Sequence, residues 1–265
     1  MGGPPITLVR RLLVVLGVAN LVVAVGMASG QAWASGWWPW PDGPLTLAFV
    51  GAILAAIGAG SLWAGLSGET GSVPAGALDL AVTLGGSAVF LAGVGPGEDR
   101  GNLTRAATVA ALLAVGNLGL FLATRRRPQA TRAPLPRPVL VAFVAFTAIL
   151  LAVALGLLLG SDRVMPWPMR PDSAVLVGWI FLGNTVYFAY AVLRPTTDGY
   201  RTQLWSFLAY DLVLLPPLLA RAPDLPGELR PNLVVYLLVL VGSAVFCVVV
   251  LLRDLRRARW VTVPG

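Results

Sequence analysis

The stretch NLVVYLLVLVGSAVFCVVVLL, residues 232–252, contains no charged residue. It has the length of about 20 residues that an α-helix needs to cross the hydrocarbon core of a bilayer. Lipid offers no partners to backbone polar groups, so such a run spans as a helix. Seven further apolar runs resemble it. We therefore predict an all-α integral membrane protein with eight transmembrane helices, at about 6–28, 45–66, 74–94, 103–124, 137–160, 173–193, 203–220 and 232–252.

The composition agrees with this class of protein. Of the 265 residues, 57% are hydrophobic and 12% are charged, about half the charged fraction of a soluble domain. The net charge of +7 does not indicate nucleic-acid binding, because the arginines lie between apolar runs. The chain has no His, and its single cysteine, Cys247, lies in an apolar run. These absences exclude an intrachain disulfide, the His-based catalytic sets and the usual zinc and haem sites. We expect no catalytic residues, no cofactor and no metal.

The arginines predict the orientation. If the N-terminus is cytoplasmic, thirteen of the 19 arginines fall on the cytoplasmic side, as the positive-inside rule expects, and both termini are cytoplasmic. Ala32-Trp33-Ala34 resembles a signal-peptidase site, but the first apolar run is long for a signal sequence, and we expect it to be retained as a helix. The all-Arg usage is typical of GC-rich bacterial genomes. Trp38-Pro39-Trp40-Pro41 resembles a segment of bacterial membrane proteins, a likeness that implies no activity. The expected location is the bacterial plasma membrane.

Four features of the first half recur in the second half at spacings of 127 to 132 residues. The pairs are Gly26-x-x-x-Gly30 with Gly156-x-x-x-Gly160, Pro39-Trp40-Pro41 with Pro166-Trp167-Pro168, Asp79 with Asp211, and Pro96-Gly97-Glu98-x-Arg100-x-Asn102-Leu103 with Pro226-Gly227-Glu228-x-Arg230-x-Asn232-Leu233. Such self-similarity predicts a duplication. We expect two tandem four-helix repeats, 1–127 and 139–265, joined by an Arg- and Pro-rich cytoplasmic linker at 128–138. Because four spans return the chain to the same side, the repeats should be parallel, with a pseudo-twofold axis along the membrane normal.

Asp79 and Asp211 are the acidic residues that we place within spans. A carboxylate in hydrocarbon is costly, so it usually faces the bundle interior or a water-filled cavity. Gly85 lies six residues after Asp79 and belongs to a Gly85-Gly86 pair, and Pro217 lies six residues after Asp211 and belongs to a Pro216-Pro217 pair. Paired helix perturbers point to a transporter's binding site. The structural alternative is that each carboxylate bonds helix-end amides or one of Arg10, Arg11 and Arg201.

The paired outer motifs have two interpretations. Pro-Gly forms a turn, and Asn102 and Asn232 would cap the following helices. Alternatively, Glu98, Arg100, Glu228 and Arg230 bind a polar headgroup at the outer face. Trp40 and Trp167 are expected to be interface anchors, and a lid over an outer vestibule is the alternative.

Other polar residues within spans are expected to join helices by hydrogen bonds. They are Asn20, Asn117, Asn184, Tyr187, Tyr190 and Tyr210. Tyr210 and Asn184 could also contribute to a site with the aspartates. The Gly-x-x-x-Gly pairs are interpreted as close-packing signals.

These features leave three hypotheses open. The first is transport or binding of a small molecule or lipid in a cavity between the repeats. The second is a non-catalytic structural or assembly subunit with a membrane protein partner. A lipid-active enzyme that uses the outer Glu and Arg residues is least favoured, because no nucleophile and base pair is evident. We place the first hypothesis ahead, because eight spans can enclose a cavity.

Overall fold

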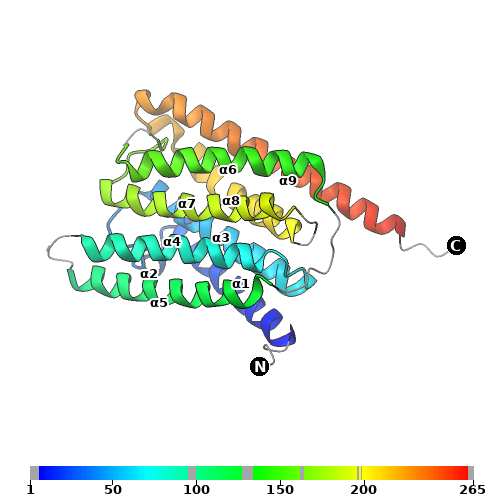
Figure 1. Cartoon of the computed structure of the whole chain (residues 1–265). Helices are drawn as coiled ribbons and strands as arrows, with labels where there is room; N and C mark the ends of the chain where they lie inside the picture. Colours follow the sequence, from blue (N-terminus) through cyan, green and yellow to red (C-terminus); the bar gives the residue numbers. More distant parts are fainter. Residues whose placement is uncertain are drawn as a thin grey trace. The chain divides into compact units, whose positions relative to one another are not determined.

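The computed structural model describes residues 6–94, 100–126, 134–161, 164–195, 197 and 199–261 (Figure 1). Within these ranges eight helices are long and apolar enough to cross a membrane, and no β-strand occurs. The all-α class and eight helices of membrane-spanning length and composition are therefore confirmed in the described residues. The helices are α1 (Ile6–Ala28), α2 (Ala32–Ser35), α3 (Pro44–Ser67), α4 (Val73–Gly93), α5 (Arg100–Thr124), α6 (Arg137–Leu158), α7 (Pro171–Leu193), α8 (Tyr200–Arg221) and α9 (Arg230–Val261), with 3₁₀ turns η1 (Ala222–Asp224) and η2 (Gly227–Leu229) before α9.

The predicted and observed helix ends agree within a few residues except at the end of α9. We predicted an end at residue 252, and the helix continues to Val261. The apolar run ends at residue 252, but the arginine-rich continuation still favours helix, because Arg is a good helix former. Several helices carry Pro in the first turn, among them α4, α6 and α7, where the missing amide hydrogen costs nothing.

The capping role predicted for Asn102 and Asn232 is wrong. Helix α5 begins at Arg100 and α9 begins at Arg230, so both Asn residues lie inside the first turn. Before α9, the 3₁₀ turn Gly227–Leu229 leads directly into the helix, and Leu229 donates its amide hydrogen to the carbonyl of Pro226 at 2.9 Å. The Pro-Gly turn therefore starts the helix earlier than the Asn would.

The chain divides into two compact units. Unit 1 contains α1, α2, α3, α8 and α9. Unit 2 contains α4, α5, α6 and α7 together with Trp37–Gly43. Neither unit coincides with the segments 1–127 and 139–265. Each unit instead combines two long helices from the first half of the chain with two from the second half.

Unit 2 is a row of four helices in the order α6, α7, α4, α5 (Figure 1). At the crossing of α4 and α7, Gly86 leaves room for the indole of Trp179, since a Cβ at this position would overlap the ring. At one end of the same row, Leu91, Leu103 and Leu176 form a buried cluster, against which Trp38 and Trp40 pack. A large ring beside a glycine thus sets the spacing of the central helix pair.

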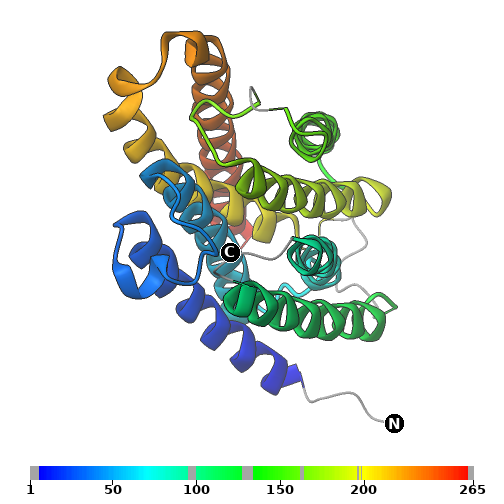
Figure 2. The same cartoon turned by 90° about the vertical axis from the view of Figure 1, so that its left-hand side faces the viewer.

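Unit 1 is also a row, in the order α1, α3, α8, α9, and its helices can be followed in Figure 2. Helix α3 contacts α8 through the ring pairs Phe49 with Tyr210 and Trp63 with Trp205. Helix α8 contacts α9 through side-chain hydrogen bonds described below. Ring contacts and polar bonds therefore connect the second half of this row.

Helices α1 and α3 pack with their backbones in close contact. Along α3, the glycines at 51, 58 and 65 recur every seven residues, and each lies against the backbone of α1. A Cβ built at Gly58 would lie 2.9 Å from the carbonyl oxygen of Gly17, and one at Gly65 would lie 2.8 Å from that of Arg10. Small residues at such a seam let two helices approach closely in a membrane.

The two Gly-x-x-x-Gly pairs form helix ends, and the close packing expected of them is found at their first glycines, Gly26 and Gly156, and not at Gly30 and Gly160. Gly30 and Gly160 have φ of +70° and +82°, a conformation that favours glycine. The amide of Gln31 donates to the carbonyl of Gly26 at 2.8 Å, and the amide of Ser161 donates to that of Gly156 at 3.0 Å. These bonds define a Schellman C-cap at the end of α1 and another at the end of α6.

Candidate functional site

Asp211 is a buried carboxylate in the middle of α8. It is 1% exposed. Its Oδ2 accepts a hydrogen bond of 2.7 Å from Ser243 Oγ on α9. Its Oδ1 is buried and has no hydrogen-bond partner. Burying a carboxylate oxygen without a hydrogen-bond donor is costly. Oδ1 of Asp211 is the acidic oxygen described in unit 1 that is buried without a donor.

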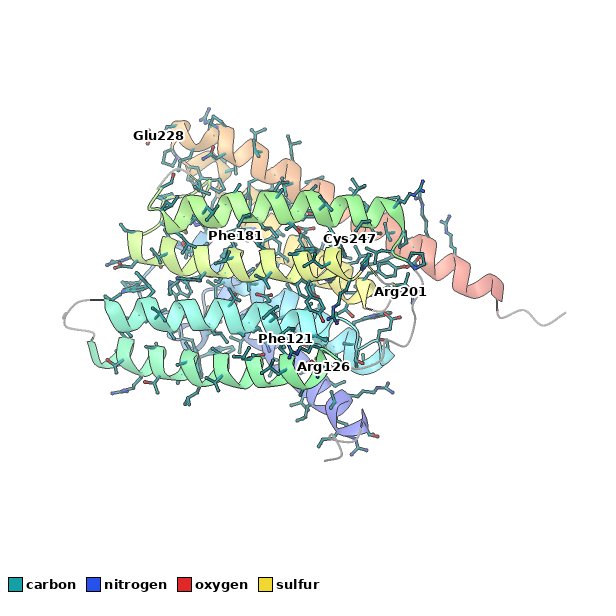
Figure 3. The ribbon with its side chains drawn as sticks, viewed as in Figure 1. Phe121, Arg126, Phe181, Arg201, Glu228 and Cys247 are labelled. Carbon is teal, nitrogen blue, oxygen red and sulfur yellow. The ribbon has the colours of Figure 1, made fainter. Side chains whose placement is uncertain are left out.

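Two tyrosines and the single cysteine lie near Asp211. The hydroxyls of Tyr210 and Tyr236 lie 2.5 Å apart and join α8 to α9, so the prediction that Tyr210 joins helices is confirmed. Both tyrosines and Cys247 interact electrostatically with the carboxyl group. Cys247 is buried on α9, and Figure 3 shows it along the bundle between Glu228 and Arg201. We name Tyr210, Asp211, Tyr236, Ser243 and Cys247 the Asp211 cluster.

Asp79 lies on α4 in unit 2, in different surroundings. Its Oδ1 accepts a hydrogen bond of 3.1 Å from Thr83 Oγ1, one turn along the same helix. The Thr83 hydroxyl also lies 3.3 Å from the carbonyl of Trp179 on α7. Across the crossing, a Cβ at Gly183 would overlap Thr83 and the Asp79 carboxylate. Asp79 therefore lies at a tight contact between α4 and α7, beside a glycine that makes room for it.

The arginines proposed as partners of the aspartates have other contacts. Arg10 donates to the carbonyls of Gly65 and Leu66 at the end of α3, at 2.9 and 2.7 Å. Arg201 forms ion pairs with Glu69 at 2.8 Å and Asp254 at 3.1 Å. Within the part of the chain that the structure describes, Arg11 forms no ion pair with either aspartate. The structural alternative in which one of these arginines binds an aspartate is thus wrong in the described residues, because Thr83 and Ser243 hydroxyls are the hydrogen-bond partners of Asp79 and Asp211.

Neither pair of predicted helix perturbers interrupts its helix. Pro216 and Pro217 lie inside α8, and Gly85 and Gly86 lie inside α4. Proline has no amide hydrogen, so the carbonyls four residues earlier, those of Leu212 and Val213, lose their usual helical donors. Polar backbone atoms therefore directly follow Asp211 on α8, although the helix is continuous.

The outer-motif residues are only partly described. Glu98 lies outside the described residues, as does the side chain of Arg100. Glu228 is exposed and Arg230 is half-buried. Figure 3 shows Glu228 and Arg201 at opposite ends of unit 1, so the outer motif before α9 lies far from the Arg201 ion pairs.

The two tryptophans of the Pro-Trp-Pro elements lie inside unit 2. Trp40 is half-buried and makes an edge-to-face contact with Phe90, with ring centroids 6.4 Å apart. Trp167 is 2% exposed and is among the largest fully buried side chains. Next to Trp40, Asp42 Oδ2 accepts hydrogen bonds from Trp38 Nε1 and Ser173 Oγ. The first element is thereby tied to the start of α7.

The intramembrane asparagines behave differently from the expectation. Asn20 and Asn117 donate to the carbonyls of Leu16 and Leu113 on their own helices, each at 2.9 Å. Asn184 is half-buried on α7, directly after Gly183. Among the predicted tyrosines, Tyr187 contacts Phe188, and Tyr190 contacts Phe121. Joining of helices by Asn20 and Asn117 is therefore wrong, since a helix supplies a carbonyl acceptor one turn away.

Sequence reasoning missed a three-helix ion cluster at the end of unit 1. Arg201 at the start of α8 binds Glu69, two residues after the end of α3, and Asp254 near the end of α9. Trp63 Nε1 donates to the other oxygen of Glu69 at 3.1 Å. The available signal was that three charged residues border three different spans on the side predicted to be cytoplasmic.

Comparisons with protein-family models, with curated proteins and with solved structures find no significant match to this chain.

Proposed function

We propose that this chain is a bacterial plasma-membrane transport protein that binds a small molecule or ion, with Asp79 and Asp211 as its intramembrane carboxylates. The observation that carries the proposal is where the two carboxylates lie. Asp79 is on α4, which packs on α7, and Asp211 is on α8, which packs on α3. These are the contacts at which the two halves of the sequence meet within each unit. Transporter sites lie at such contacts between repeats.

The packing order of the two units supports the proposed duplication. If the halves are equivalent, then α1, α3, α4 and α5 correspond to α6, α7, α8 and α9. The row α1, α3, α8, α9 then corresponds member by member to the row α6, α7, α4, α5. In this proposal each half contributes its first helix pair to one unit and its second pair to the other.

The helix ends support the same proposal. The caps at Gly30 and Gly160 have the same hydrogen-bond pattern and lie 130 residues apart. A bulky side chain follows each cap and lies against its first glycine, Trp33 against Gly26 and Val164 against Gly156. Two copies of one ancestral helix pair are expected to share both the C-cap and the packing contact beside it.

The orientation that we propose places both termini in the cytoplasm. The ion cluster of Arg201, Glu69 and Asp254 then lies on the cytoplasmic side, and Glu228 and Arg230 lie on the outer side, where they could bind a headgroup. Charged residues that cluster at both ends of unit 1 fit the polar regions of a bilayer.

A structural or assembly role is the second candidate, and the surroundings of Asp79 favour it. The carboxylate has a hydroxyl partner on its own helix and meets α7 at a glycine with no room for a methyl group. Such a group can fix the register of two helices without binding anything. In this case the chain would serve a membrane protein partner, and Asp211 would also be inaccessible.

The native cysteine tests the proposal. Cys247 is the only thiol of the chain, and it belongs to the Asp211 cluster. The wild-type protein in sealed vesicles is treated with a charged, membrane-impermeant thiol reagent from each side in turn. We expect labelling of Cys247, because a transport site must open to water.

The matched control is Val245→Cys in a Cys247→Ser background. Val245 lies on the same helix but is 57% exposed on its apolar face, where lipid excludes a charged reagent. Labelling of Cys247 and not of the control indicates a water path to the cluster. If neither position reacts from either side, the transport proposal is wrong, and the structural role takes its place.

A second set of single cysteines extends the test to both carboxylates. Cysteine replaces Asp79 or Asp211, with Leu78 and Leu212 as neighbouring controls, again in the Cys247→Ser background. Reaction at the two aspartate positions alone supports a path shared by both. Reaction at 211 and not at 79 assigns the site to unit 1 and a packing role to Asp79.

A further inference from the structure

The Asp211 cluster holds an acid whose charge nothing compensates. Ser243 satisfies one carboxylate oxygen, and the other is buried without a partner. No Arg in the described residues forms an ion pair with Asp211, since Arg201 is engaged by Glu69 and Asp254 and Arg10 by carbonyls of α3. An ionised carboxylate in this position would be a buried charge without a counter-ion, which is strongly unfavourable.

The described helices that pack against the cluster, α3, α8 and α9, supply no cationic group to it. Helix α3 contains no charged or titratable residue between Pro44 and Ser67. From α8 the titratable neighbour is Tyr210, and from α9 the neighbours are Tyr236 and Cys247. A phenol or a thiol that ionises becomes negative, so none of the three can neutralise a carboxylate.

A metal cation is a poor fit to the cluster. In the described residues no group of three His, Cys, Asp or Glu is arranged to hold a metal. Ser243 Oγ lies within hydrogen-bond distance of Oδ2 and of the carbonyls of Val239 and Leu240, and the two tyrosine hydroxyls bind each other. The carbonyls of Leu212 and Val213, which lack helical donors, point toward the C-terminal end of α8. The side chains of this helix, that of Asp211 included, tilt toward its N-terminal end. These oxygens therefore diverge from the carboxylate.

We propose that Asp211 is a proton-binding site, with the proton on Oδ1 and the Ser243 hydroxyl bonded to Oδ2. A proton needs one oxygen, and it turns a buried charge into a neutral acid. The inference rests on the proposed transport function, in which Asp211 is the group that couples a proton to transport. Asp79, whose Oδ1 accepts a hydrogen bond from Thr83, is a second intramembrane carboxyl group and provides a matched control.

Infrared spectroscopy of the purified full chain in lipid nanodiscs tests this inference. A protonated carboxylic acid has a carbonyl band that the ionised form lacks. We expect a band that disappears as the pH rises, is lost in Asp211→Asn and persists in Asp79→Asn. A wild-type spectrum identical to that of Asp211→Asn at every pH would show that Asp211 stays ionised, and it would overturn the inference.

Ser243→Ala provides a second variant that does not depend on the folding of Asp211→Asn. It removes the hydrogen bond to the carbonyl oxygen of the acid, so the band should shift in frequency. An unshifted band would assign the signal to another carboxyl group and contradict the proposal. Replacing sodium with potassium or choline should leave the band unchanged, and displacement of the band by sodium would show a cation site instead.

The two proposals fail separately. A titrating band in a protein whose Cys247 resists labelling from both sides would leave the proton site in place and remove the transport function. A labelled Cys247 without any band lost in Asp211→Asn would keep the transport function and remove the proton.

Discussion

The glycine seam between α1 and α3 gives the sharpest stability prediction. The perturbation is Gly58→Ala, which adds one methyl group at the centre of the seam. The added Cβ would lie 2.9 Å from the carbonyl oxygen of Gly17 and 2.9 Å from Cγ of Leu21. Ordinary contacts of a Cβ begin at 3.4 Å, so the two backbones must separate by about half an ångström. The carbonyl cannot rotate away, because it belongs to a helix.

The magnitude follows from two opposing effects. Overpacking of a tightly packed contact costs about 1–3 kcal/mol. Replacing Gly by Ala inside a helix returns up to about 1 kcal/mol through helix propensity. The net loss in the free energy of unfolding is therefore about 0–3 kcal/mol. A control that shares the propensity gain but lacks the contact isolates the first effect.

Gly119→Ala is that control, because a Cβ at Gly119 in α5 would meet no other atom within 4 Å. Both variants and the wild type are unfolded with a denaturing detergent, and helix loss is followed by circular dichroism. We expect Gly58→Ala to be about 1–3 kcal/mol less stable than Gly119→Ala. Equal stability of the two variants would refute the close approach of α1 and α3.

Three further changes test other contacts. Arg201→Gln removes two ion pairs in which the arginine side chain is 37% exposed, so the loss in the free energy of unfolding should be at most about 1 kcal/mol. Melting of the variant and the wild type in low and high salt checks it. A stability difference between them that does not shrink with salt would contradict the electrostatic cause. Gly86→Ala places a methyl group inside the space of the Trp179 indole and should destabilise the protein by about 1–3 kcal/mol. The near-ultraviolet circular dichroism spectrum should change as well. An unchanged spectrum and melting temperature would count against the observed crossing of α4 and α7. Ser173→Ala removes a donor to the Asp42 carboxylate and should cost about 1.5–3 kcal/mol; a melting temperature equal to that of the wild type would show that the bond contributes nothing.

Much of the secondary structure could be predicted from the sequence. Eight apolar runs predicted eight spanning helices, and the ends agree except where α9 continues to Val261. The predicted recurrence of Gly30 and Gly160 drew attention to the right residues, but their role was misjudged. A positive φ at a helix end is a property of the local chain, so the order of Gly and the bulky residue after it could have indicated a cap.

The candidate site could be predicted only in part. An aspartate in an apolar run is conspicuous, so Asp211 and Asp79 were identified from the sequence. Their partners were not, because Ser243 lies 32 residues from Asp211 and Gly183 lies on the crossing helix of Asp79. Tyr236 and Cys247 were also missed as neighbours of Asp211, although the spacing of 236, 240, 243 and 247 along α9 is typical of one helix face.

The sequence by itself determined that this chain forms apolar helices of membrane-spanning length, because hydrocarbon leaves a backbone no alternative to internal hydrogen bonds. Only the tertiary structure decided which helices pair. Apolar helices gain little from exchanging lipid for one another, so pairing depends on close fit and on hydrogen bonds between distant residues. For that reason the glycines of α3 lie on α1, the second helix pair of each half packs with the first pair of the other half, and Asp211 faces Ser243 with one oxygen unpaired.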